Sequence, residues 1–269
     1  MSLTGSSDSE SNPSRPPPPP PLYIEALENL TVKFGNTYEY SKDNVTWTSG
    51  TSSTSISANA GERVFFRASG LTASSSSGIG TFTISNGNCN VGGNVMSMVY
   101  GADFDGKTEI TQAYQFKNLF YVSSTSTSNM RIIDASGLAL PTTAMTDYCY
   151  AYMFYNQKKL TSSPALPATT LANYCYEKMF RGCTSLVNAP ALPATTLANY
   201  CYERMFDGCT SLNYIKAMFI TYPSSSYMGY WVENVPTTGT FVKNSAATWS
   251  NSFGTSAIPS GWTVELADA

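Results

Sequence analysis

Residues 166–191 read LPATTLANYCYEKMFRGCTSLVNAPA, and residues 192–217 read LPATTLANYCYERMFDGCTSLNYIKA. The two segments differ at six positions, so 20 of 26 residues are identical. A related segment, residues 140–165, matches the first of them at 11 of 26 positions. An internal repeat of this length is typical of stacked units that cannot bury their apolar face alone. The sequence therefore predicts a short array of 26-residue units.

Each unit is predicted to be a helix followed by a short extended segment. Five apolar residues of the second unit recur at the spacing of one helix face, and they are Leu171, Cys175, Met179, Phe180 and Cys183. Gly182 stands where a left-handed residue often ends a helix. Pro190 and Pro193 follow soon after and exclude a long hydrogen-bonded strand. Stacking of such units would join their apolar faces into one core.

The repeat resembles a known family. Its F-x-x-C-T-S-L core, at Phe180–Leu186 and Phe206–Leu212, is similar to the BspA-type leucine-rich repeats of Bacteroides-like anaerobes and their phages. The later segments GTFVKNSAATW (239–249) and IPSGWTVE (258–265) are similar to those that close such arrays. The first unit departs from the pattern, because Gln157 replaces the second cysteine and predicts a weaker core there. The resemblance implies a surface-exposed binding or adhesion role.

The remaining segments complete the expected organisation. Residues 22–100 alternate apolar and polar side chains between turn signals, which predicts an antiparallel β-sandwich. Residues 218–269 hold three of the four tryptophans and are predicted to be a cap over the last repeat. The expected fold is thus mixed α+β, with an N-terminal β-sandwich, a leucine-rich-repeat solenoid and a C-terminal cap. Its parts are an extended arm (1–21), the sandwich (22–100), the repeats (101–217, with regular units 140–165, 166–191 and 192–217) and the cap (218–269).

Composition argues against several classes of function. The chain has no histidine, which removes His-based acid–base catalysis and most zinc sites. A net charge of -3 with only 12% charged residues does not suit a phosphate-binding surface, so no nucleic acid partner is expected. No stretch approaches the length of a membrane span, and no secretory signal is visible. Asp103-Phe104-Asp105-Gly106 reads as a tight turn. We expect no catalytic, cofactor-binding or metal-binding residues.

Two residue types recur on the repeat lattice. The six cysteines are expected to be free, buried and small, and they are Cys89, Cys149, Cys175, Cys183, Cys201 and Cys209. The repeat tyrosines flank cysteines on both sides and are expected to be half exposed, and they are Tyr148, Tyr150, Tyr174, Tyr176, Tyr200 and Tyr202. They could form structural ladders between units or an aromatic face for a partner.

A partner-binding site is predicted where the two closest units differ. Four consecutive differences lie in the extended segment, where side chains need not serve the shared core. Specificity is therefore assigned to Val187 and Asn188 in one unit and to Asn213, Tyr214, Ile215 and Lys216 in the next.

An anchor is predicted in the N-terminal arm. The run Pro16, Pro17, Pro18, Pro19, Pro20 and Pro21 should adopt polyproline II and be undocked in the isolated chain. The alternative is a plain linker. As an anchor, the run would join other virion proteins or further copies of the chain.

These expectations combine into a functional hypothesis. The chain is expected to be a non-enzymatic structural and adhesion protein, a phage fibre or capsid-decorating component that binds a host cell-surface protein or glycan through its repeats. It would be assembled in the bacterial cytoplasm and reside in the virion. The alternative is a BspA-like adhesin of the bacterial cell surface whose export signal was removed.

Overall fold

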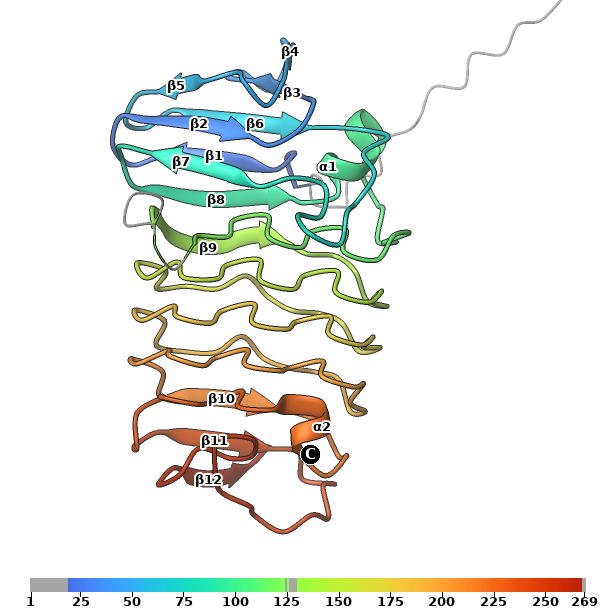
Figure 1. The fold of residues 1–269 in the computed structure, drawn as a ribbon, viewed down its shortest axis with the longest axis vertical. Helices are drawn as coiled ribbons and strands as arrows, with labels where there is room; N and C mark the ends of the chain where they lie inside the picture. The colour runs from blue at the N-terminus through green and yellow to red at the C-terminus, as the bar shows by residue number, and fades with distance from the viewer. Residues whose placement is uncertain (1–18, 124, 126–129, 268–269) are drawn as a thin grey trace, which may run out of the picture.

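The computed structural model describes residues 19–123, 125 and 130–267. These residues form an elongated body (Figure 1) with two β-sheets at one end, stacked turns in the middle and a small sheet at the other end. The described residues are mainly β-structure in three open sheets. The expected mixed α+β fold with a helix-containing leucine-rich-repeat solenoid is therefore wrong.

Two sheets form the N-terminal end, as the alternating pattern predicts. The larger has the order β4-β3-β6-β1-β8-β9, built from β1 (Tyr23–Ala26), β3 (Tyr38–Ser41), β4 (Thr48–Gly50), β6 (Arg63–Arg67), β8 (Cys89–Asn94) and β9 (Ile132–Ala139). The smaller has the order β5-β2-β7, built from β2 (Leu30–Phe34), β5 (Ile56–Ala58) and β7 (Phe82–Ser85). Phe66 and Phe82 meet between them with ring centroids 4.9 Å apart. The arrangement is sandwich-like, but β8 and β9 pair in parallel rather than antiparallel.

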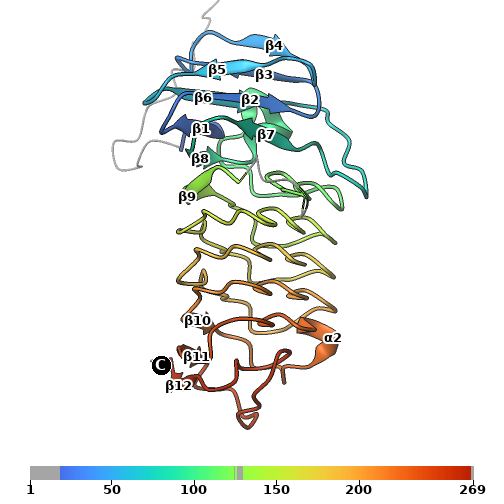
Figure 2. The ribbon, with the colours of Figure 1, turned by 60° about the vertical axis from the view of Figure 1, so that its left-hand side comes forward.

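The remaining elements are short. They are α1 (Ser97–Tyr100), the 3-10 helix η1 (Gly101–Asp103), β10 (Tyr214–Ala217), α2 (Ser225–Met228), β11 (Thr240–Lys243) and β12 (Thr263–Leu266). Strands β10, β11 and β12 form a parallel sheet at the C-terminal end. Figure 2 shows β9 to β12 along one side of the body, with the turns of the repeats on another.

The helices predicted for the repeats are replaced by successive turns. The two described α-helices have four residues each and lie outside units 140–217. Within the units, backbone N–H groups alternate between two kinds of acceptor. Tyr150 donates to the carbonyl of Cys175 in the next unit at 3.0 Å, whereas Ala151 donates to Tyr148 in its own unit at 3.1 Å. Half of these N–H groups therefore hold neighbouring layers together.

The backbone conformation has a period of four residues. Tyr174, Lys178 and Gly182 have positive φ angles of 57°, 52° and 74°. Cysteine 175, Met179 and Cys183 recur at the same interval and are fully buried. In an α-helix of 3.6 residues per turn, positions eight apart would diverge by about 80°. Here a left-handed residue in every fourth position changes the direction of the backbone, so side chains four residues apart keep pointing the same way.

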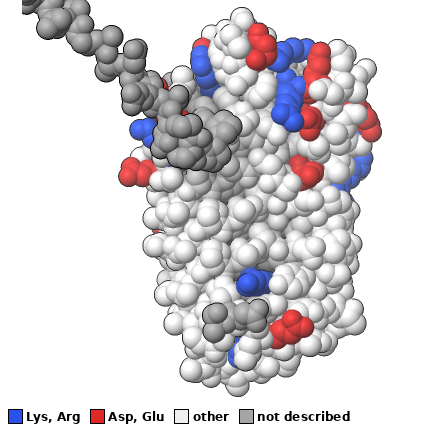
Figure 3. All heavy atoms as spheres, turned by 180° about the vertical axis from the view of Figure 1, so that it is seen from behind, with Lys and Arg blue, Asp and Glu red and all other residues white. Residues whose placement is uncertain are grey.

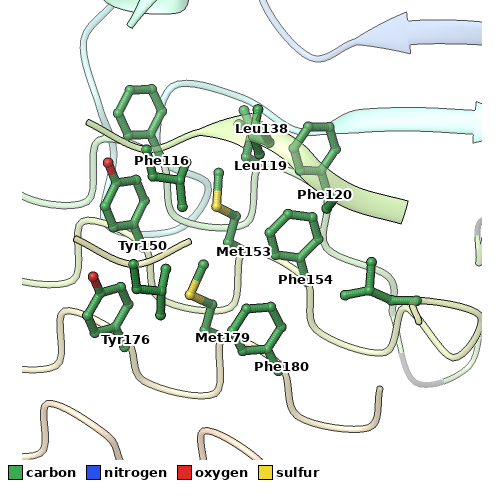
Figure 4. Packing of buried hydrophobic residues seen from close by; sticks show 14 of the residues in the cluster. Phe116, Leu119, Phe120, Leu138, Tyr150, Met153, Phe154, Tyr176, Met179 and Phe180 are labelled. Carbon is green, nitrogen blue, oxygen red and sulfur yellow. The ribbon is translucent and has the colours of Figure 1, made fainter. Parts of the chain in front are cut away.

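Equivalent side chains lie above one another in columns through the core. Figure 4 shows two of these columns, one of phenylalanines and one that continues as tyrosines. Phe154 and Phe180 stack with centroids 5.6 Å apart and planes 5° apart, and Tyr150 and Tyr176 are 6.0 Å apart. At the N-terminal end, the phenylalanine column continues into β7 through Phe82. The sheets and the repeats therefore share one apolar core.

The C-terminal residues close this core. Trp231 is fully buried and contacts the last ring of both columns, Tyr202 and Phe206. Trp249 and Trp262 are also buried. Trp231, Trp249 and Trp262 are therefore all buried at this end of the core.

Gln157, which replaces the second cysteine in the first unit, makes the hydrogen bond that the cysteine makes in the other units. Cys183 and Cys209 each donate a thiol hydrogen bond of 3.1 Å to a carbonyl one layer away. Gln157 takes the same role, because its amide donates to the Phe120 carbonyl at 2.8 Å. The predicted weakness at this position is therefore compensated by a longer hydrogen-bonding side chain.

Candidate functional site: the tyrosine face of the repeats

Four tyrosines form a stacked column on the turn side of the repeats, and they are Tyr114, Tyr148, Tyr174 and Tyr200. Successive ring centroids are 4.8, 4.5 and 4.8 Å apart, and neighbouring planes differ by 16°, 3° and 14°. The first three rings are half-buried and Tyr200 is exposed. Because each ring covers the face of its neighbour, the faces of the inner rings are closed to a partner. We call these four residues the tyrosine column.

The other three repeat tyrosines do not share this exposure. Tyr150, Tyr176 and Tyr202 are 0–1% exposed, so the expectation that both flanking tyrosines are half exposed is wrong for them. In the four-residue turn series, two adjacent positions point inward, and these are the cysteine and the tyrosine after it. On a helix, the two flanking tyrosines would have diverged to either side of the cysteine.

A second column lies one turn further along, formed by Tyr152, Lys178 and Arg204. The ammonium group of Lys178 donates to the Tyr152 hydroxyl and to Glu177 Oε1, both at 2.6 Å, and lies 4.8 Å from the centre of the Tyr152 ring. Burial opposes the charge, but the hydrogen bonds to Glu177 and Tyr152 raise the pKa of Lys178 overall. This cation is held in place and stays charged.

Lys117 adds a positive charge beside the tyrosine column. Its ammonium lies 5.4, 5.6 and 5.5 Å from the ring centres of Tyr114, Tyr148 and Tyr152. It also donates to the Ser75 carbonyl at 2.7 Å, which ties the loop before β7 to the first turn layer. Partial burial lowers the pKa of Lys117.

Arg204 carries the charge pattern toward the C-terminal end. Its guanidinium donates to Asp207 and Glu233, both at 3.0 Å, and lies 4.6 Å from the centre of the Tyr230 ring. Arg181 also bonds to Asp207, at 2.7 Å. We call the tyrosine column together with Lys117, Tyr152, Lys178 and Arg204 the tyrosine face. It combines aromatic rings with three positive charges, and those of Lys178 and Arg204 are paired with neighbouring carboxylates.

Part of this face was missed from the sequence. Lys178 and Arg204 stand at one of the six positions where the two closest units differ, yet both are basic. The positive charge common to Lys178 and Arg204 was the sequence feature that could have identified them as part of this face. Lys117 and Tyr152 could not be found in this way, because their positions carry different residue types in the other units.

The residues predicted to bind a partner lie on the strand side instead. The structure brings them together, since the Asn213 N–H donates to the Val187 carbonyl at 2.9 Å and Asn188 bridges to Tyr214. Val187, Asn188 and Asn213 are exposed, and Tyr214 and Lys216 are half-buried. We call these five residues the variable strip. Ile215 is 0% exposed and belongs to the core, so it is not available to a partner.

The proline run is anchored where it can be described. Pro16, Pro17 and Pro18 lie outside the described residues. The Pro20 carbonyl accepts a 2.8 Å hydrogen bond from Asn94 at the end of β8, and Pro21 is buried. The described end of the run is therefore docked on its own chain, contrary to the expectation of an undocked segment.

Other candidate chemistry is limited. All six cysteines are buried and free, and burial raises the pKa of Cys149 to about 12. Asp103 ends η1 and Gly106 has a φ of 70°, which fits a turn. Within the described part of the chain, no group of three or more Cys, Asp or Glu residues is placed to hold a metal ion. No described helix has the length and apolar character to cross a membrane.

Charge is unevenly distributed over the surface. On the face seen in Figure 3, charged side chains gather over the N-terminal sheets and are sparse over the repeat layers.

Comparison of the chain with protein-family models, curated proteins and solved structures found no match.

Proposed function

We propose that this chain is a non-enzymatic structural and adhesion protein that binds a cell-surface component through the tyrosine face. The observation that carries the proposal is the tyrosine column, four parallel rings held at one side of a continuously bonded stack. Tyrosine and arginine are enriched at protein interfaces, since tyrosine offers a large rigid area with a polar tip. A preformed array also loses little side-chain entropy on binding.

The orientation of the rings defines the chemistry of the ligand. Their faces are covered within the column, so a sugar cannot stack on the inner rings. A partner would instead bond to the tyrosine hydroxyl groups and to the ammonium groups of Lys117 and Lys178, which the bonds to Ser75 and Glu177 hold in place. The ligand would be a host cell-surface protein, or a glycan bound through its hydroxyl groups.

The proposed setting is a phage particle, with the chain as a fibre or capsid-decorating component. The similarity of the F-x-x-C-T-S-L core to BspA-type repeats of gut anaerobes and their phages supports this setting. The docked prolines lie beside the N-terminal sheets, so an attachment there would let the repeats project outward. A BspA-like adhesin on the bacterial surface would use the same face.

Binding to cells of Bacteroides-type anaerobes and to a glycan array tests the proposal. The triple variant Tyr148→Phe, Tyr174→Phe and Tyr200→Phe removes three hydroxyls and keeps the rings stacked. Because each hydrogen bond contributes about 1 kcal/mol, we expect affinity to fall by about tenfold or more. The matched control is Val187→Ala with Asn213→Ala on the variable strip, which should bind as the parent chain does.

Two results would contradict the proposal. Loss of binding in the control alone would assign recognition to the variable strip. Equal binding by all three chains would remove both surfaces. Antibody labelling of phage particles and of bacterial cells separates the two settings.

A further inference from the structure

A pocket of about 270 Å³ lies where the proline run meets the N-terminal sheets. Eight residues line it, and they are Pro19, Pro20, Pro21, Asn44, Trp47, Arg67, Ala102 and Phe104. Six of the eight are prolines, aromatic residues or alanine. The pocket lies outside the tyrosine face, two aromatic residues line it, and the chain's own prolines form one of its walls.

The opposite wall is held in place by polar contacts. The guanidinium of Arg67 lies 4.0 Å from the centre of the Trp47 indole and donates to Glu39 at 2.7 Å. The charge of Arg67 is therefore balanced within the chain, and the indole is fixed against it. Trp47 is half-buried rather than enclosed.

We propose that this pocket binds the proline run of a second copy of the chain. Grooves lined by aromatic residues recognise polyproline II segments, because these are extended before binding and lose little entropy. The chain itself supplies such a segment in Pro16–Pro18, because Pro19–Pro21 already form a wall of the pocket in their own copy.

The occupant comes from another copy for a geometric reason. Consecutive prolines hold a straight polyproline II helix with fixed φ angles. Pro19–Pro21 form a wall of the pocket and therefore cannot also fill it. A second run can lie alongside the first. Pairing of two copies through this pocket does not depend on the function proposed for the tyrosine face.

Sedimentation velocity of the full chain over a range of concentrations tests the proposal. Ala102 is exposed at the pocket, so Ala102→Arg fills the pocket mouth without disturbing the core. Thr108→Arg places the same charge on an exposed residue outside the pocket and is the matched control. The arm variant carries Pro16→Ser, Pro17→Gly and Pro18→Ser.

We expect the parent chain and the Thr108→Arg variant to self-associate alike. The Ala102→Arg and arm variants should each associate at least tenfold more weakly. Mixing these two variants should restore association, because one retains a free arm and the other a free pocket. A peptide of six prolines should compete with association of the parent chain.

Any of three results overturns the proposal. They are a parent chain that stays monomeric up to about 1 mM, unchanged association of either variant, and failure of the mixed variants to pair. These results do not depend on ligand binding by the tyrosine face, so the two proposals fail separately.

Discussion

Replacing Gly182 or Gly208 by alanine tests the turn geometry of the repeats. Both glycines occupy the third left-handed position of their unit, with φ angles of 74° and 77°. Their surroundings differ, however. A Cβ on Gly208 would lie 3.6 Å from the Gly182 Cα, an ordinary contact, whereas a Cβ on Gly182 would collide with Asn156 Oδ1. The two substitutions therefore share one cost, and only Gly182→Ala carries the second.

The magnitudes follow from these surroundings. A left-handed alanine costs about 1–2 kcal/mol, and the loss of chain entropy in the unfolded state offsets about 0.4–1 kcal/mol of it. Gly208→Ala should thus lower the free energy of unfolding by about 1 kcal/mol. Gly182→Ala must also displace Asn156, whose amide donates to the Val122 carbonyl at 3.3 Å. Losing that bond adds about 1 kcal/mol, for a total of about 2 kcal/mol.

Thermal and urea unfolding measure both values. For a chain of this size, 1 kcal/mol corresponds to about 3 °C in melting temperature. Introducing Asn156→Gly removes the collision, so Gly182→Ala in that background should cost only about 1 kcal/mol. Equal effects of the two alanines, with no change in the Asn156→Gly background, would refute the packing described here. A stabilising effect of either alanine would refute the left-handed conformation.

Three further outcomes are expected. Tyr176→Phe should leave the free energy of unfolding unchanged or raise it, because the Tyr176 hydroxyl is buried without a partner. Tyr150→Phe should lower it by about 1 kcal/mol, because the hydrogen bond to Thr142 is lost. The midpoints of urea unfolding compare the two variants. Gln157→Leu should cost about 2 kcal/mol, since a buried carbonyl loses its donor, and a smaller loss in thermal unfolding would contradict that role. Burial raises the pKa of the Cys149 thiol to about 12, so the native chain keeps a proton that the unfolded chain releases near pH 8.5. The melting temperature should therefore fall as the pH rises above about 8.5. The fall should be less steep in the Cys149→Ala variant.

Which residues of successive repeats lie side by side, and which cysteines are buried, could be predicted from the sequence. The 26-residue period correctly implied that equivalent residues would be neighbours, as the Asn188–Tyr214 bridge shows. It also implied that cysteines such as Cys175 would be buried. The half exposure of Tyr148 and Tyr174 was predicted too, and stacking between units was one of two alternatives for them. Binding by the variable strip stays a prediction.

The local conformation was predicted wrongly for a physical reason. Apolar residues four apart fit one face of a helix over a single unit, since the drift is only about 40° per step. The same interval fits turns with a left-handed residue in every fourth position. Tyrosine and lysine at those positions, as at Tyr174 and Lys178, give no local sign of positive φ, because their intrinsic preference is against it.

Residue types were thus enough to predict the 26-residue period and the burial of the cysteines and of the C-terminal tryptophans. Repetition and the apolar character of side chains are already present in the amino-acid sequence. The choice between helix and turn could not be predicted from residue types, since it depends on where the backbone N–H groups find acceptors. In an isolated unit the N–H of Tyr150 would have to bond within its own helix. In the stack it reaches the Cys175 carbonyl of the next layer, and this bond exists only once the layers are assembled. The half-buried Tyr148 and the buried Tyr150 take their places from that assembly.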